Sequence, residues 1–351
     1  MLTDIFAYRY EKRQIWDSFG EPERRLLVQG FRMCEQLFPY WYDGKENPLT
    51  KPKWQQIHDK LSMELGVTEL SQSYYSYQTM WNGKPYTQSG SSTMDHVCKS
   101  FVCADYNPAI KPDRFMKDRI SFIEIAFRER ELEIKAANTA LPQRIKEAQL
   151  QDRLPHGSGI RIPGSRIESI KAMNEGLNNA FATLGTELNE RFRRAGCGLN
   201  YHNGFIQISM DEVTQKNLED PFWAVVSGVI WKNVDLDVKE SIDRRDAGIK
   251  DAAFYSARAL ESAIKIISDQ KGWTHGGEKG AHSYIDNLCN KRGGNLIEEW
   301  EKKALKDFFT SVRNPIGHGP GSEEMRELSQ QQTSWATELC MAWIKNLLLR
   351  L

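Results

Sequence analysis

Apolar side chains recur at helical spacing over most of the 351-residue chain, with few of the alternating patterns that predict strands. The first helical run, residues 11 to 38, is closed by Pro39. Further runs predict helices over residues 52 to 65, from about Pro112 onward, and over residues 166 to 194. This pattern predicts a mostly α protein.

Two kinds of segment interrupt the helices. Apolar and polar residues alternate on both sides of Asn203-Gly204, a dipeptide typical of two-residue hairpin turns, so residues 198 to 209 are predicted to form a β-hairpin, the one sheet expected. Residues 39 to 50 and 82 to 93 are rich in turn-forming residues and are predicted to be loops. Pro142 is expected to bend or end the long helix in which it lies.

The sequence pattern changes from about Val234 onward, where short connections join strongly helical runs. Residues 250 to 269 are Ala-rich with an apolar stripe, residues 296 to 313 are also helical, and a last helix is predicted over residues 323 to 350 with Ser322 as its N-cap. These runs predict a C-terminal helical bundle.

The change in sequence pattern predicts two regions. We place their boundary near residue 232, which gives an N-terminal region, residues 1 to 232, and a bundle, residues 233 to 351, with a sub-boundary near residue 110 in the first.

Composition excludes several classes of protein. Lysine and arginine together number 47, as do aspartate and glutamate, so the chain as a whole is not attracted to nucleic acid. This balance is still compatible with a local basic patch. The N-terminus lacks an apolar signal segment, and no apolar run approaches the roughly 20 residues of a membrane helix. The chain has six scattered cysteines, which favour a reduced, cytoplasmic setting: Cys34, Cys98, Cys103, Cys197, Cys289 and Cys340. His96, Cys98 and Cys103 lack a fourth zinc ligand, so we expect no metal and no other cofactor.

The segment VRNPIGHGPG holds the most specific chemistry, since Arg313, Asn314 and His318 fall within six residues. RNA is cut without metal when its 2′-OH attacks the neighbouring phosphorus and the 5′-oxygen leaves. Histidine suits the proton transfers, arginine matches phosphate oxygens with a fixed charge, and asparagine can orient either group. Because the segment offers one histidine and the reaction needs two proton transfers, a C2 homodimer with facing segments is expected. The competing interpretation is a helix C-terminus with Arg313 paired to an acid and His318 in a solvated turn.

The motif RNPIGH resembles the Arg-x4–6-His pattern of the HEPN superfamily, and the helical runs from residue 250 to the C-terminus resemble its four-helix arrangement. The upstream segments MLTDIFAYRY, LLVQGFR, ELNERFRRAGCGLNYHNGFIQIS and DPFWAVVSG resemble AbiJ-type abortive-infection N-terminal domains. Together these resemblances cover most of the chain, and they imply a sensor or regulatory region over residues 1 to 232 and an RNase domain over residues 233 to 351.

The resemblance implies a metal-independent endoribonuclease that works as a homodimer, leaves 2′,3′-cyclic phosphate ends on tRNA or mRNA, and acts in phage defence or toxin-like growth arrest. Arg313, Asn314 and His318 match the catalytic positions. Glu261, a carboxylate beside the apolar stripe that needs a partner, would orient Arg313 or His318. A phage-derived activator or a regulatory partner would fit such a protein. The alternatives are a non-catalytic dimerisation or partner-binding module and a nucleotide-binding regulator.

Two groups of aromatic and cationic residues are secondary candidates. The loop KGWTHGGEKGAHSY offers groups that suit a stacked base and a phosphate: Trp273, His275, Lys279 and His282. An ordinary helix connection is the alternative. Aromatic rings in the N-terminal turns suit a recognition surface or half-buried loop packing: Tyr40, Trp41, Tyr42, Tyr74, Tyr75 and Tyr77.

Overall fold

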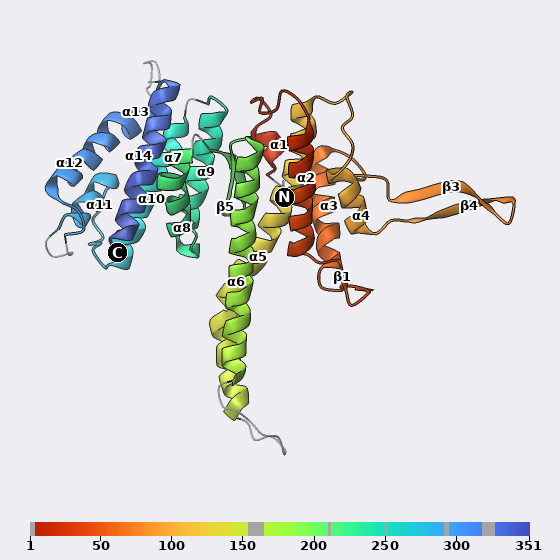
Figure 1. Cartoon of the computed structure of the whole chain (residues 1–351). Helices are drawn as coiled ribbons and strands as arrows, with labels where there is room; N and C mark the ends of the chain where they lie inside the picture. Colours follow the sequence, from red (N-terminus) through yellow and green to blue (C-terminus); the bar gives the residue numbers. More distant parts are fainter. Residues whose placement is uncertain (1–3, 154–164, 210–211, 250, 291–294, 318–326) are drawn as a thin grey trace. The chain divides into compact units, whose positions relative to one another are not determined.

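The computed structural model describes residues 4–153, 165–209, 212–249, 251–290, 295–317 and 327–351. These residues are mostly α-helical, as the sequence predicts, and their strands form three two-stranded antiparallel sheets. The chain divides into two compact units, Met1–Ile206 and Gln207–Leu351 (Figure 1).

The first unit consists of helices and two β-hairpins, followed by a third hairpin where the chain passes to the second unit. The helices are α1 (Phe6–Arg9), α2 (Glu21–Leu37), α3 (Lys51–Leu65), α4 (Met94–Val102), α5 (Pro112–Arg153) and α6 (Ser165–Ala195). The strands are β1 (Trp41–Tyr42), β2 (Lys45–Glu46), β3 (Tyr74–Trp81), β4 (Lys84–Ser91), β5 (Leu199–His202) and β6 (Phe205–Ile208).

Aromatic side chains from three helices form the centre of this unit. The ring of Trp54 in α3 lies 5.5 Å from that of Phe31 in α2 and 6.3 Å from that of Phe122 in α5, centroid to centroid. Helices α2 and α5 approach closely at Gly30, where an added Cβ would lie 2.4 Å from Cδ1 of Ile123. Three runs that the sequence predicts as helical therefore supply the centre of this unit.

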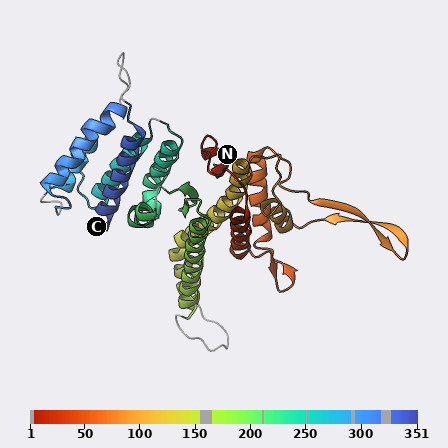
Figure 2. The ribbon, with the colours of Figure 1, turned by 45° about the horizontal axis from the view of Figure 1, so that its top comes forward.

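Helices α5 and α6 lie side by side over much of their length, in both views of the chain (Figures 1 and 2). The sequence predicted that Pro142 bends or ends its helix. Helix α5 continues through Pro142, so the helix does not end there. The side chain of Pro142 is exposed. At an exposed position the carbonyl that loses its helical partner can bond to water instead, which lowers the cost of the proline.

The hairpin of β3 and β4 corrects the prediction of a loop over residues 82 to 93. Eight residue pairs join the two strands, from Tyr74 opposite Ser91 to Trp81 opposite Lys84, around a turn at Asn82-Gly83. Nearly every residue of both strands is exposed, including Tyr74, so no buried face marks the hairpin in the hydrophobic pattern. A second unpredicted sheet is the short pair β1–β2.

The hairpin predicted at residues 198 to 209 is confirmed by β5 and β6. Asn203 and Gly204 both have positive φ, as a type I′ turn requires. Helix α5 holds this hairpin through Glu124, which is buried and accepts a hydrogen bond from the Ile206 amide at 2.7 Å. Arg128 donates to the same carboxylate at 2.6 Å and to the Gly204 carbonyl at 2.7 Å.

Apart from the end of β6, the described secondary structure of the second unit is helical. Its first part comprises α7 (Glu212–Thr214), the π-helical turn η1 (Gln215–Glu219), α8 (Asp220–Val225), the 3-10 turn η2 (Val229–Trp231) and α9 (Lys232–Asp246). Its second part comprises α10 (Ala252–Gln270), α11 (Ala281–Leu288), α12 (Glu299–Phe308), the π-helical turn η4 (Phe309–Arg313), α13 (Asn314–Gly317) and α14 (Gln330–Leu349).

Helices α9, α10 and α14 pack around one apolar core. The stripe predicted on α10 is buried, including Leu260 and Ile264, and it meets Ile344 of α14. Ser241 of α9 lies in this core, where its hydroxyl donates to the Ala252 carbonyl at 2.8 Å. The core therefore fixes α10 as the central helix of the unit.

Two helix starts differ from the sequence prediction by more than five residues. The run over residues 11 to 38 is broken, because α2 begins only at Glu21, with Pro22 in its first turn. The last helix begins at Gln330 and not at residue 323, and its N-cap is Ser329, whose hydroxyl accepts a hydrogen bond from the Gln332 amide. The cap predicted at Ser322 lies outside the described residues.

The division between the compact units falls after Ile206, whereas the regional boundary predicted from the sequence falls near residue 232. Residues 207 to 232 belong to the second compact unit. The assignment of regulation to residues 1 to 232 and catalysis to residues 233 to 351 stays a prediction. None of the described helices is both long and apolar enough to cross a membrane.

Candidate functional site

Arg313 stands at the end of a widened helical turn. Helix α12 runs to Phe308, the turn η4 follows in π-helical geometry, and α13 continues directly from Asn314. The widening comes just before Pro315, which lacks the N–H that a regular α-helical turn would use. Short π-helical turns inside α-helices are frequent at functional sites. The described residues that follow Arg313, 314 to 317, are helical.

The guanidinium of Arg313 is held by a carboxylate from another helix. Its Nη2 donates to Oε2 of Glu261 in α10 at 3.2 Å, and its Nη1 donates to Oδ1 of Asn314 at 3.4 Å. The side chains of Arg313 and Glu261 are 22% and 11% exposed, so the ion pair is largely shielded from water while its arginine still reaches the surface. The sequence predicted that Glu261 needs a partner, and the structure brings the two residues together.

Neighbouring side chains define the place of this pair. Lys265, one turn along α10, bonds the other oxygen of Glu261 at 2.8 Å. The guanidinium carbon of Arg313 lies 5.9 Å from the ring centre of Phe254, which puts a weakly polar face beside the charge. The buried Nε of Arg313 has no hydrogen-bond partner among the described residues.

A pocket of about 420 Å³ opens beside the ion pair. It is lined by Glu261, Lys279, Gly280, Ala281, His282, Phe309, Arg313 and Asn314. Two cationic side chains, an imidazole and an amide thus face one space with a single carboxylate, which Arg313 and Lys265 already neutralise. The lining favours an anion in the size range of a nucleotide fragment.

Glu278 fixes the loop that carries Lys279 into this pocket. Its carboxylate accepts hydrogen bonds from the His275 amide at 2.6 Å and from the Asn287 side chain at 2.9 Å. These bonds, the His275 amide first, lower the pKa of Glu278 to about 2. The loop is therefore tied to α11 by a carboxylate that stays ionised at neutral pH.

The tautomer of His282 follows from its neighbour. Thr310 Oγ1 lies 2.9 Å from the Lys306 carbonyl, which can only accept, so the hydroxyl proton points there. The same Oγ1 lies 3.3 Å from Nε2 of His282 and must accept from it. In the neutral ring Nδ1 is then an acceptor, and no described residue bonds to it.

The structure brings five of the predicted site residues together. Arg313, Asn314, Glu261, Lys279 and His282 line one pocket. His318 lies outside the described residues, so its part in the motif stays a sequence prediction.

The other two loop residues do not line that pocket. Trp273 is half-buried against the core of the second unit, and the ring of His275 is exposed. Of the aromatic residues proposed as a recognition surface, Tyr40 is buried, whereas five are 41% to 76% exposed: Trp41, Tyr42, Tyr74, Tyr75 and Tyr77.

Sequence reasoning missed two supporting residues. Lys265 holds Glu261, and its spacing of four residues along α10 could have indicated the pair. Thr310 orients His282, a contact across 28 residues that no local pattern announces. In the part of the chain that the structure describes, no cluster of three or more His, Cys, Asp or Glu residues is placed to hold a metal ion.

The fold and pocket define a two-unit helical protein whose second unit presents an arginine–carboxylate pair at an anion-compatible pocket. The family of the chain follows from its first part: residues 4–224, more than half of the chain, match the model of AbiJ N-terminal domain 4. The chain therefore belongs to this family, which indicates a role in abortive infection, a form of phage defence. No curated protein and no solved structure matches the chain significantly.

Proposed function

We propose that the protein is a metal-independent endoribonuclease of the HEPN type that acts in abortive infection. The observation that carries the proposal is the pocket in which Glu261 holds Arg313 beside Lys279 and His282. The AbiJ-type first part of the chain supports the setting in phage defence.

The reaction has two proton transfers and one developing charge. The ribose 2′-OH loses its proton and attacks the adjacent phosphorus, the bond to the 5′-oxygen breaks, and that oxygen gains a proton. The products are a 2′,3′-cyclic phosphate and a 5′-OH. Arg313 binds the phosphate and stabilises the charge that grows on its oxygens, while Asn314 positions phosphate and guanidinium.

The proton transfers fall to histidines in this proposal. His318 is assigned one of them by the sequence motif. The general base is His282 in this proposal, since its Nδ1 has no hydrogen-bond partner among the described residues. Lys279 binds a flanking phosphate. Two imidazoles in one chain would remove the need for a second protomer to supply proton transfer, although a homodimer remains part of the proposal because facing pockets would enlarge the RNA surface.

The proposal also includes the cellular location, the substrate and the activator of the reaction. We place the reaction in the cytoplasm, with tRNA or mRNA as substrate and a phage-derived component as activator. An activator is needed because an unrestrained ribonuclease would harm an uninfected cell.

The test is RNA cleavage in the presence of EDTA by wild type, Arg313→Ala and His318→Ala. Arg258→Ala is the matched control, since Arg258 is an exposed arginine on α10 whose partner is Asp237. Cleavage by wild type and control with cyclic phosphate ends, and loss in both other variants, is expected. Equal cleavage by wild type and Arg313→Ala would overturn the proposal and favour a non-catalytic binding module.

A further inference from the structure

A second concentration of arginine lies in the first unit and includes no residue of the proposed nuclease site. Helix α2 buries Leu26, Leu27 and Phe31 and turns the opposite face outward. Arg25, Gln29 and Arg32 follow one another on this face at spacings of four and three residues, which aligns them along the helix.

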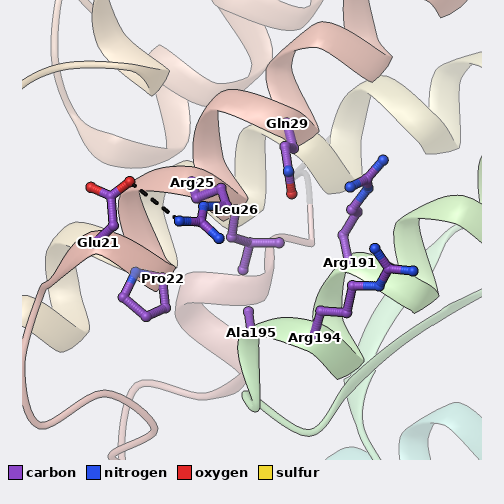
Figure 3. Close-up of a pocket in the computed structure, with 8 residues that line it drawn as sticks. All are labelled: Glu21, Pro22, Arg25, Leu26, Gln29, Arg191, Arg194 and Ala195. Carbon is purple, nitrogen blue, oxygen red and sulfur yellow. Dashed lines mark ion pairs between the residues drawn. The ribbon is translucent and has the colours of Figure 1, made fainter.

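The C-terminal end of α6 packs against this part of α2 and adds further arginines (Figure 3). Figure 3 shows Arg191 and Arg194 extending from α6 on one side of a pocket, with Arg25 and Gln29 from α2 on the other. This pocket has a volume of about 280 Å³. A second pocket of about 380 Å³ shares Glu21, Arg25 and Gln29 with it. We call the two adjoining pockets the arginine groove; its arginines are Arg24, Arg25, Arg32, Arg191 and Arg194.

Positive charge exceeds negative charge in the groove. Five arginines line it against one carboxylate, Glu21, which serves both Arg24 at 3.2 Å and Arg25 at 3.6 Å. On α6, Glu187 and Glu190 pair with Arg191 and Arg194, each at 2.6 Å, but neither carboxylate lines the groove.

Several guanidinium groups retain donors for a ligand. Arg32 is exposed, and no described carboxylate pairs with it. Arg24, Arg25 and Arg194 are each more than half exposed, and exposed ion pairs of this kind are weak enough for a phosphate to replace them. The groove is therefore an anion surface with unused capacity.

The lining decides which part of a nucleic acid fits. No aromatic side chain lines either pocket, so the stacking platform that holds unpaired bases is missing from the described lining. Arginine forks match phosphate oxygens with two parallel hydrogen bonds. Two adjoining pockets suit successive phosphates of one chain better than a single small anion.

We propose that the arginine groove binds the phosphodiester backbone of the RNA that the second unit cuts, without regard to base sequence. The identity of the nucleic acid as RNA rests on the proposed function. The formal charge of the whole chain is zero, so the chain as a whole does not attract RNA. The local surplus of arginine in the groove would therefore supply the affinity for the phosphates. The first unit would then deliver substrate as well as regulate.

The experiment measures binding of the full chain to a fluorescent single-stranded RNA that carries 2′-O-methyl groups and cannot be cut by 2′-OH attack. Wild type is compared with the double variant Arg25→Glu/Arg194→Glu. Arg144→Glu/Arg166→Glu is the matched control, because both residues are exposed in the same unit, outside the groove, and the charge change is equal. Retained helicity by circular dichroism confirms that each variant folds.

The groove variant is expected to bind at least about tenfold more weakly, and its plot of log K against log salt should be shallower by about 1.4, which is ~0.7 for each of two lost contacts. The control should stay within about twofold of wild type. Arg25→Lys/Arg194→Lys should keep most of the affinity, since it keeps the charge. Equal RNA binding by wild type and groove variant overturns the inference, as does binding of DNA of the same sequence but not of the RNA.

Cleavage of unmodified RNA is measured in parallel, so that the two proposals fail separately. If RNA binding depends on the groove and no variant cleaves RNA, the groove proposal is supported and the nuclease proposal is overturned. If wild type cleaves RNA and all variants bind it equally, the nuclease proposal is supported and the groove proposal is overturned.

Discussion

Glu261 and Arg313 lie 52 residues apart in sequence and meet at 3.2 Å, carboxylate oxygen to guanidinium nitrogen. Glu261 comes from α10, the helix at the centre of the second unit's core, whereas Arg313 ends the π-helical turn η4. A rigid helix thus holds the one group of the motif whose charge is permanent. The pair links the core of the fold to the pocket.

Replacing Glu261 by glutamine should therefore reduce function more than stability. Glutamine keeps the shape and one acceptor oxygen but loses the charge, so Arg313 is oriented less firmly. We expect RNA cleavage to fall about tenfold and the free energy of unfolding to fall by about 1 kcal/mol. Cleavage rates and urea unfolding measure the two effects.

Lys265→Ala provides the control for that substitution. Lys265 bonds the same carboxylate, but its side chain is 41% exposed and does not line the pocket. Its loss should leave cleavage within about twofold, since exposed ion pairs contribute little. A larger loss of cleavage in Lys265→Ala than in Glu261→Gln would contradict the role given to the Glu261–Arg313 pair.

His282 gives a second prediction for the same pocket. If its Nδ1 takes a proton during cleavage, His282→Ala should lower the rate by about 100-fold or more at unchanged stability. Thr310→Val should have a smaller effect, because it removes only the oxygen that fixes the tautomer. Rates within twofold of wild type for His282→Ala would remove the residue from catalysis and leave Lys279 and Arg313 as phosphate ligands.

The hydrophobic pattern was sufficient where one face of an element is buried. The stripe of Leu260 and Ile264 on α10 and the Asn203-Gly204 hairpin were predictable for that reason. The β3–β4 hairpin was not, because Tyr74 and Trp81 face solvent and no alternation marks a buried side. The start of α14 was also misplaced, since Ser322 and Ser329 are both capping residues and only tertiary structure selects between them.

The site was predictable only in part for a similar reason. A carboxylate such as Glu261 beside an apolar stripe signals that it needs a partner, and the Arg313-Asn314 motif signals chemistry. The contact of His282 with Thr310 depends on how α11 packs against α12 and η4, which sequence spacing does not encode.

The start of α14 can be tested by removing its cap. The Ser329 hydroxyl accepts a hydrogen bond from the Gln332 amide, and the Gln332 side chain accepts one from the Ser329 amide. Ser329→Ala should cost about 1 kcal/mol of unfolding free energy. Ser334→Ala inside the same helix is the control and should be neutral or slightly stabilising, because alanine is the better helix former. Equal stabilities of the two variants would place the helix start elsewhere.

The β3–β4 hairpin should be dispensable for stability. Because its strands are exposed along nearly their whole length, removing them uncovers little of the core. Tyr74 and Ser91 pair directly, so an Asn-Gly turn in place of residues 75 to 90 can close the chain. We expect the free energy of unfolding to change by less than about 0.5 kcal/mol, as for other surface changes. A loss of several degrees in melting temperature would show that the hairpin packs on the unit in solution.

Glu219 predicts how the stability of the second unit depends on pH. Its side chain is 6% exposed, and burial raises its pKa from 4.5 to about 7, although Arg245 and the Ser209 hydroxyl act in the opposite direction and Asp220 and Asp246 add to the rise. A raised carboxyl pKa means that the folded state prefers the protonated form. The contribution of this group to the free energy of unfolding is therefore fully present below pH 4.5 and is lost as the pH rises through 7. The loss is about 3 kcal/mol.

Glu219→Gln isolates this contribution, since glutamine stays neutral at every pH. Relative to wild type, the variant should be more stable at pH 8.5, where wild type buries a charge, and nearly equal at pH 5, where most of the wild-type carboxyl is protonated. Urea unfolding at the two pH values gives the difference. Glu240→Gln, at an exposed carboxylate that pairs with Arg244, should show no such dependence. A variant less stable than wild type at pH 8.5 would mean that the ionised Glu219 is stabilised by Arg245 more strongly than it is penalised by burial.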